Sequence, residues 1–310
     1  MRIAALAGGV GGTKLAQGLA RLLQPGDLTI IVNTADDFEH LGLHISPDLD
    51  TVCYTLAGIS SRETGWGRSN ESWNAMDALQ QLGGPTWFRL GDRDLATHLE
   101  RTRRLRQGKP LSQVVREFCG TWGIKQVILP MTDANVATIL QTDEGDLEFQ
   151  EYFVHRQCRP RVRGFEFRGV SSALPAPGVL DALSSADAII ICPSNPWVSI
   201  APILAVPGIQ SLVAARKAIA VSPIIGGRAL RGPAAKMYSE MGLEPSALAV
   251  AARYQDVVGG FVIDSHDADL EVLIRRLGMQ TLVCNTIMPT LQDRRRLARD
   301  VLDFLRADWT

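Results

Sequence analysis

The sequence lacks the features that would place it in a membrane, in an oxidising compartment or on nucleic acid. No apolar run reaches the roughly eighteen residues that a membrane-spanning helix needs. The five cysteines are dispersed without a C-x-x-C pair, which is typical of reduced cytosolic thiols. The net charge of −1 provides no basic field for nucleic acid. Because the chain starts directly with an apolar strand, no targeting segment fits there, and we expect a cytoplasmic protein.

Three common catalytic or nucleotide-binding signatures are also missing. No G-x-S-x-G motif occurs, which argues against acyl transfer by a serine nucleophile. A Walker loop needs adjacent glycine and lysine, but Thr13 separates Gly12 from Lys14. A dinucleotide fingerprint that starts at Gly9 would need a third glycine where Lys14 stands. Any phosphate site near the start of this chain is therefore of another type.

A glycine-rich turn nevertheless follows the first strand. Arg2–Ala7 is apolar, and leucines spaced three to four residues apart begin at Leu15 and predict a helix after the turn. When a glycine loop joins a strand to the start of a helix, the free backbone N–H groups at that start can bind an anion. The alternative is a tight turn without a ligand, but so many glycines exceed what a plain turn requires. We predict a phosphate or pyrophosphate site formed by Gly8, Gly9, Gly11, Gly12 and Lys14.

The segment from Asn33 to Thr55 is rich in acids and follows an apolar strand, Leu28–Val32. Its carboxylates are those of Asp36, Asp37, Glu39, Asp48 and Asp50. Open α/β sheets hold ligands and metal ions just past the carboxyl ends of their strands. Oxygen ligands at this density suit Mg²⁺. A solvated acidic loop is the alternative, but the apolar residues interleaved with the acids (Leu41, Leu43, Ile45, Leu49 and Val52) argue against it.

The alternation of strands and helices predicts an α/β fold. We expect a Rossmann-like, mostly parallel sheet with right-handed crossovers and helices on both faces. Residues 58–124 look like a mainly helical insertion that caps a nucleotide-binding core formed by 1–57 and 125–310. Alternation and turn residues predict a β-hairpin from Ala137–Thr142 and Leu147–Val154, with an edge strand at Val162–Arg168. Six predicted strands end in polar or glycine-rich loops, at Gly8, Asn33, Asp133, Ser194, Ser222 and Asp264.

In a parallel sheet these six loops would converge on one cleft, which indicates an enzyme or a nucleotide-binding protein. The residues expected in this cleft suit group transfer at phosphorus. They are glycine loops, carboxylates and a cation from Lys14, Arg93 or Lys236. Mg²⁺ would bind the phosphoryl oxygens, and an aspartate could accept a proton.

The remaining histidines and Asn195 leave alternatives open. His40 and His44 have the spacing of zinc ligands, but Gly42 between them weakens a helical reading and no glutamate follows His40. Apart from zinc, these two histidines are substrate contacts or packing residues. We expect His98 and His266 to be ordinary structural or surface residues. Asn195 lies between two prolines, and it is either a turn residue or a contact to a nucleotide base.

Five segments of the chain resemble a known enzyme family. They are AGGVGGTKLAQGL (7–19), VNTADDFEHLGLHISPDLDTVCYTLAG (32–58), RLGDRDLATHLERT (89–102), SNPWVSI (194–200) and VSPIIGGRALRGPAAKM (221–237). The family comprises the 2-phospho-L-lactate transferases of coenzyme F420 biosynthesis and their bacterial phosphoenolpyruvate-using counterparts. The resemblance extends over almost the whole chain, and the PDLDT and LGDRD blocks are its most specific parts.

The resemblance implies a Mg²⁺-dependent transfer of a substituted phosphate group. The terminal ribityl hydroxyl of the deazaflavin Fo would attack the β-phosphate of a guanosine-diphospho ester of lactate or enolpyruvate, releasing GMP. It places Asp50, Asp92 and Arg93 at Fo, and the catalytic acids Asp36, Asp37 and Asp50 at the metal. The nucleotide would lie against Gly8, Gly9, Gly11, Gly12, Lys14, Asn195, Gly226 and Gly227. It also favours a homodimer.

Other interpretations remain open at this stage. Trp66, Arg68 and Trp73 resemble the bacterial branch and favour enolpyruvate, although the two donors differ by only two hydrogens. A regulatory protein that binds nucleotides of the UDP-sugar type would share the glycine loop. A nucleotide hydrolase would release GMP without an acceptor.

Overall fold

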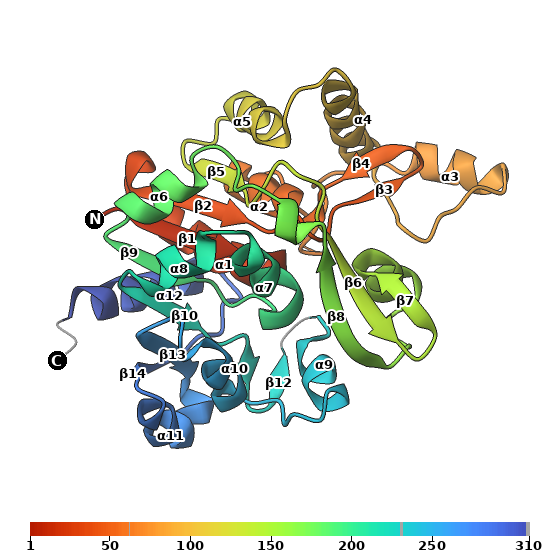
Figure 1. The fold of residues 1–310 in the computed structure, drawn as a ribbon. Helices are drawn as coiled ribbons and strands as arrows, with labels where there is room; N and C mark the ends of the chain where they lie inside the picture. The colour runs from red at the N-terminus through yellow and green to blue at the C-terminus, as the bar shows by residue number, and fades with distance from the viewer. Residues whose placement is uncertain (62, 230–231, 308–310) are drawn as a thin grey trace.

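The computed structural model describes residues 1–61, 63–229 and 232–307. Its centre is a seven-stranded sheet with the order β14-β13-β10-β9-β1-β2-β5, in which every neighbouring pair is parallel (Figure 1). The strands are β1 (Ile3–Ala7), β2 (Leu28–Val32), β5 (Val127–Pro130), β9 (Ala188–Ile191), β10 (Ala218–Val221), β13 (Gly260–Asp264) and β14 (Gln280–Cys284). The predicted α/β fold with a parallel sheet is confirmed.

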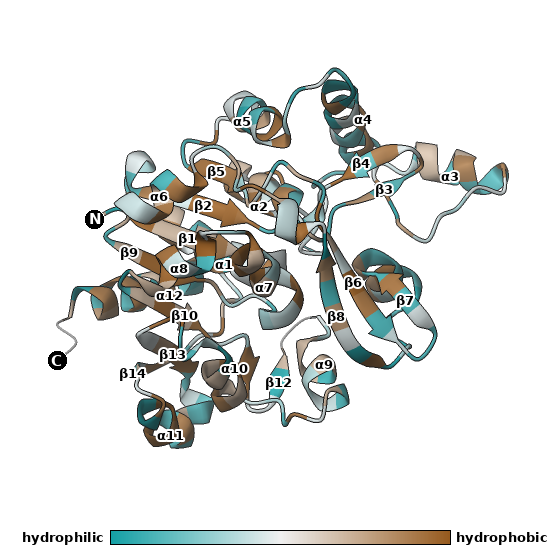
Figure 2. Ribbon diagram, viewed as in Figure 1, coloured by the Kyte–Doolittle hydropathy of each residue, from teal (hydrophilic) through white to brown (hydrophobic). Residues whose placement is uncertain are grey.

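Helices cover both faces of this sheet. Successive residues of β1 belong to opposite cores: Ile3 and Ala5 pack on one side, Ala4 and Leu6 on the other. Strands buried on both faces are continuously apolar, as Figure 2 shows for the central strands. One core includes residues of α1 (Gly9–Ala20), α2 (Pro47–Ala57), α5 (Leu111–Thr121) and α12 (Leu291–Arg306). The other includes residues of α6 (Val179–Ser185), α7 (Ala201–Ala205), α8 (Ile209–Ala214), α10 (Ala247–Tyr254) and α11 (Glu271–Arg276).

A small antiparallel sheet, with the order β7-β6-β8, lies beside the main one. It contains β6 (Ala137–Thr142), β7 (Gly145–Glu148) and β8 (Val162–Arg168), so the predicted hairpin and edge strand are confirmed. The second hairpin strand was predicted too long, because residues 151–155 form a π-helix, η2 (Glu151–His155). Phe149 and Tyr152, three residues apart, pack into the cluster beneath this sheet, and a helical turn brings both inward. α9 (Ala234–Glu240) packs against β8.

An outer lobe lies above the small sheet in the view of Figure 1. It consists of the hairpin β3 (Phe38–His40) and β4 (Leu43–Ile45) with α3 (Asn74–Gln81) and α4 (Asp92–Arg106), and it has its own cluster around Ile45, Met76 and Leu90. The predicted insertion, 58–124, extends too far. α5 buries Leu111 and Val115 in the core of the main sheet, so it belongs to the core.

The remaining short elements connect these layers. They are η1 (Pro25–Asp27), η3 (Val170–Ser172), η4 (Pro196–Ile200), η5 (Ser265–Leu270), β11 (Ile224–Ile225) and β12 (Arg228–Ala229). β1 lies between β9 and β2, so the chain leaves the centre of the sheet in opposite directions at this point. Such a switch point leaves a crevice between the loops at the carboxyl ends of the strands. Gly8, after β1, and Ser194, after β9, lie there.

Candidate active site

The turn after β1 is fastened to the loop after β9. The N–H of Gly8 donates to Ser194 Oγ at 3.1 Å, and Ser194 Oγ donates to the carbonyl oxygen of Gly8 at 2.7 Å. A Cβ at Gly11 would lie 2.4 Å from the Pro193 carbonyl oxygen, and one at Gly12 would lie 2.2 Å from Ser194 Oγ. Gly11 is therefore required by close backbone packing at the switch point, and Gly12 by the position of the Ser194 hydroxyl.

This packing leaves hydrogen-bond donors at the start of α1. N–H groups in the first turn of a helix have no acceptor within the helix. Gly8 uses its N–H on Ser194, and Gly9 donates to Asp48 Oδ1 at 2.7 Å. Among the described residues, no acceptor takes the N–H groups of Val10 and Gly11, and both residues line a cavity of about 640 Å³. That volume is within the range of about 300–1,000 Å³ that is usual for ligand pockets.

Asp36 and Asp48 both line this main cavity. Asp36 is 3% exposed, and no group in the described part of the chain donates a hydrogen bond to its Oδ1. Burial raises the Asp36 pKa well above its ordinary value, and the charge of Asp48 raises it further. Burial also raises the pKa of Asp48 to about 6, although Gly9 and Asn33 donate to its two oxygens. An orphaned carboxylate oxygen beside a second carboxylate fits a hard divalent cation.

Asp37 was predicted to share the metal, but it does not line the main cavity. Its Oδ2 accepts a hydrogen bond from Ser46 Oγ at 2.7 Å and lies 3.1 Å from His44 Nε2. His40 faces other partners: its ring lies 5.0 Å from that of Trp87 and 5.8 Å from that of Phe88. The two histidines therefore stabilise the hairpin with different neighbours, and the paired zinc arrangement is not formed.

Asp50 lines the main cavity, yet it is paired with a buried arginine. Arg101 Nη1 donates to Asp50 Oδ2 at 3.0 Å, and Nη2 donates to Oδ1. Asp50 is 6% exposed and Arg101 is 1% exposed. A metal ion or an acceptor at Asp50 would have to compete with this guanidinium, which sequence reasoning did not anticipate.

Asp94 and His98 complete a buried cluster around this ion pair. Tyr54 donates to Asp94 Oδ1 at 2.7 Å, and His98 Nε2 lies 3.4 Å from the same oxygen. Ligand atoms of Asp50, Asp94 and His98 all lie within 4.8 Å of one another, but the guanidinium of Arg101 already provides the positive charge there. His98 was predicted to be a structural or surface residue; the structure places it in the interior, where it also lines the main cavity. Asp94, His98 and Arg101 share one face of α4, and this spacing was the signal available in the sequence.

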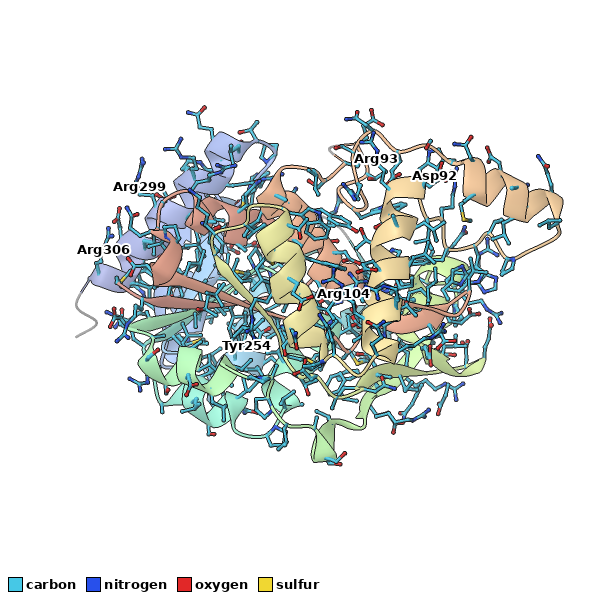
Figure 3. All side chains as sticks on the ribbon, turned by 90° about the horizontal axis from the view of Figure 1, so that it is seen from above. Asp92, Arg93, Arg104, Tyr254, Arg299 and Arg306 are labelled. Carbon is cyan, nitrogen blue, oxygen red and sulfur yellow. The ribbon has the colours of Figure 1, made fainter. Side chains whose placement is uncertain are left out.

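Asp92 and Arg93 are at the start of α4 (Figure 3), and neither lines the main cavity, although the next residue, Asp94, does. Asp92 accepts hydrogen bonds from Ser72 Oγ at 2.6 Å and from the N–H of Ala75 at 3.0 Å, so it organises the start of α3. These bonds lower its pKa to about 2. Arg93 is exposed. Their predicted contact with Fo is not supported by this placement. Arg89 lines the main cavity instead.

The other predicted nucleotide contacts are divided between the main cavity and its surroundings. Lys14 and Asn195 line it, and Asn195 Oδ1 accepts the N–H of Trp197 at 2.9 Å, which is a turn role. Gly226 and Gly227 do not line it. The N–H of Gly226 donates to the Asp267 carboxylate instead, at 3.0 and 3.1 Å.

Comparison with known proteins supports one family. Residues 3–301 match the model of the family described as 2-phospho-L-lactate transferase CofD. A phosphoenolpyruvate transferase of Kitasatospora aureofaciens is 42% identical over 311 residues, with 97% of each chain covered. A 2-phospho-L-lactate transferase of Methanosarcina mazei is 40% identical over 295 residues, covering 95% of this chain and 97% of the relative.

Solved structures share the fold at much lower identity. A UPF0052-family protein from Bacillus halodurans aligns with a TM-score of 0.64 and 15% identity over 97% of this chain and 98% of its own. In the part of the chain that the structure describes, no helix has both the length and the apolar character needed to cross a membrane.

Proposed function

The chain belongs to the 2-phospho-L-lactate transferase family of coenzyme F420 biosynthesis, and on this premise we propose the reaction that it catalyses. The ribityl hydroxyl of Fo attacks the β-phosphorus of a guanosine-diphospho ester of lactate or enolpyruvate. A bond forms between that hydroxyl oxygen and phosphorus, the bond from phosphorus to the oxygen of the α-phosphate breaks, and GMP leaves. The phospho-acid group is thereby joined to Fo.

One observation carries this proposal: a helix start with open N–H groups and two buried carboxylates line the same cavity at the switch point of the sheet. Val10 and Gly11 offer backbone N–H groups to the donor's phosphates, and Lys14 adds a positive charge. Positioning and charge stabilisation of this kind account for most catalysis at phosphorus.

Asp36 and Asp48 are the residues that would hold Mg²⁺. Bound there, Mg²⁺ would neutralise charge on the phosphoryl oxygens of the donor. Asn33 Nδ2 donates to Asp48 Oδ2 at 3.1 Å and Gly9 donates to Oδ1, so this carboxylate is fixed in orientation before any ion arrives. Asp48 would therefore contact both the metal ion and, through Gly9, the glycine turn that we propose binds the phosphates.

Arg89, in the segment that leads into α4, lines the main cavity, and its guanidinium lies 4.3 Å above the ring of Trp73. Such a stacked guanidinium suits a carboxylate or a planar ring. Both candidate donors carry a carboxylate. The resemblance around Trp66 and Trp73 to the bacterial branch supports enolpyruvate as the preferred acid.

The proposal is tested by mass spectrometry of the product. The protein is incubated with Fo, Mg²⁺ and each candidate guanosine-diphospho ester, and we expect equal amounts of GMP and of a phosphodiester of Fo. Release of GMP in the absence of Fo, with no diester formed, would instead identify a nucleotide hydrolase. Tight binding of nucleotides with no turnover of any donor would identify a nucleotide-binding regulatory protein.

A further inference from the structure

A second cavity, of about 600 Å³, lies beside the main one. Its walls come from described residues between Gly58 and Trp73 and from the start of α4. Four residues line both cavities: Thr64, Trp66, Gly67 and Asp94. These four therefore mark the boundary between the two cavities.

Asp94 is the buried member of this boundary, being 7% exposed. Its Oδ1 accepts the hydroxyl of Tyr54, whereas none of the hydrogen bonds between the described residues ends at its Oδ2. A Cβ built on Gly67 would lie 3.9 Å from this Oδ2, so the free oxygen faces the segment that separates the cavities. A buried carboxylate with one free oxygen directed at a cavity boundary is suited to a polar ligand group.

The contrast with Asp50 decides which aspartate can take a proton. Both oxygens of Asp50 are engaged by Arg101, so protonating that carboxylate would break a buried ion pair. Arg101 Nη1 also lies 3.2 Å from His98 Nδ1. A guanidinium can only donate, so the ring proton of a neutral His98 is on Nε2, which faces Asp94 Oδ1. Tyr54 Oη and His98 Nε2 thus both lie on the Oδ1 side of Asp94.

We propose that Asp94 is a catalytic residue whose Oδ2 accepts the proton of the attacking hydroxyl, and that the alcohol substrate reaches it from the second cavity. This inference rests on the proposed function. The hydroxyl proton passes to Asp94 Oδ2 as the oxygen–phosphorus bond forms, and GMP leaves with the electron pair of the bond that breaks. The donor occupies the main cavity, so the two substrates meet at Asp94.

The lining of the second cavity fits a polyhydroxylated chain attached to a planar ring. Ser60, Ser61 and Ser69 provide short hydroxyls, and Trp66 and Trp73 provide aromatic surface. Trp66 is 46% exposed, so its ring is accessible for stacking.

The first experiment compares Asp94→Asn with wild type under saturating donor and Mg²⁺. We expect kcat to fall by about a hundredfold or more, because a positioned general base contributes about 10²–10⁴. Binding of GDP, measured by calorimetry, stays within twofold of wild type. Formate added to Asp94→Ala restores part of the lost rate, which a purely structural role would not allow. The matched control is Asp77→Asn, on the exposed side of α3, which keeps wild-type kcat.

A kcat of Asp94→Asn within threefold of wild type would overturn the catalytic role. If that variant does not fold, Asp94→Glu, which keeps the charge but displaces the oxygen, is expected to slow transfer at least tenfold, and an unchanged rate would count against the role in the same way. If wild type itself forms no diester with Fo, the proposed function fails, and that result is distinct from any effect of position 94.

The second experiment fills the second cavity with Ser61→Trp. We expect the KM for Fo to rise at least tenfold, whereas the KM for the donor changes less than twofold. Ser185→Trp, on the exposed end of α6, adds the same bulk elsewhere and leaves both values unchanged. An unchanged KM for Fo in Ser61→Trp would refute the proposed access route.

Discussion

Arg101 and Asp50 form a fully buried ion pair that joins α4 of the outer lobe to α2 of the main sheet. Arg101 Nη1 lies 3.0 Å from Asp50 Oδ2, and the guanidinium also donates to the carbonyl oxygen of His44 at 3.4 Å. Because α2 also carries Asp48, this pair links the position of the outer lobe to the proposed metal site.

The pair makes a specific prediction about stability. Removing one charge leaves the other buried and uncompensated, so Arg101→Met is expected to lower the free energy of unfolding by about 3–5 kcal/mol. The double variant Arg101→Met/Asp50→Leu removes both charges and should recover most of this loss in urea unfolding. Arg103→Met breaks an exposed pair with Glu100 and should cost less than about 1 kcal/mol. Full additivity of the two core substitutions would contradict the coupling.

Gly12→Ala tests the packing of the glycine turn. Its Cβ would lie 2.2 Å from Ser194 Oγ, so either that hydroxyl gives up its hydrogen bonds with Gly8 or the turn and the loop after β9 separate. We expect a loss of about 1–3 kcal/mol in stability and at least a tenfold weaker affinity for GDP by calorimetry. Gly26→Ala, where a Cβ would meet nothing within 4 Å, serves as the control. Wild-type affinity in Gly12→Ala would show that the turn does not form the phosphate site.

Asp48 predicts how pH affects the metal-free protein. Burial raises its pKa from the ordinary 3.8 to about 6, so the folded state binds this proton more tightly than the unfolded chain. Its stabilising contribution is fully present below pH 3.8 and is lost as the pH rises through about 6. The Tm of metal-free wild type should therefore fall between pH 5 and pH 8. The Tm of Asp48→Asn, which lacks this titrating group, should fall less over the same range.

Mg²⁺ should reverse this loss. Protons compete with the ion for the same oxygens, so Mg²⁺ is expected to raise Tm more at pH 8 than at pH 5. In Asp36→Asn and Asp48→Asn the shift should be much smaller, and EDTA should stop transfer by wild type. An equal Mg²⁺ shift at both pH values would argue against these carboxylates as the ligands.

Trp87 connects the outer lobe to the small sheet. Its ring is stacked on His155 of η2, with centroids 5.0 Å apart and planes 21° from parallel. Phe88 and Phe153, from the same two segments, line the main cavity. Trp87→Ala is expected to cost about 1 kcal/mol and to raise the KM of both substrates. Leu82→Ala, at an 85% exposed position nearby, should change neither. Unchanged KM values in Trp87→Ala would show that the stack does not shape the cavity.

The fold was largely predictable because each central strand is a short apolar run followed by a polar or glycine-rich loop. The glycine-rich segment after β1 also stood out in the sequence, although its reason differs: Gly11 and Gly12 lie in the first turn of α1 and are needed for close packing. The roles of Asp50 and Asp92 were not predicted, because they depend on partners distant in sequence. Asp50 is paired with Arg101, and Asp92 accepts hydrogen bonds from Ser72 and Ala75. The sequence shows where a carboxylate stands along the chain, but not which donor forms a hydrogen bond or ion pair with it. Asp94 was overlooked for the same reason, since its free oxygen is evident only once Tyr54 occupies the other.

The central position of β1 also has a consequence for the order of events during synthesis. β1 pairs with β9, and Gly8 is fastened to Ser194, a residue 186 positions later. β1 pairs early with β2, but its other edge therefore remains unpaired until β9 has left the ribosome. Contacts of such long range slow folding and leave strand edges exposed. The glycine turn that follows β1, although it precedes β9 by so many residues, therefore becomes one of the later parts of the molecule to mature.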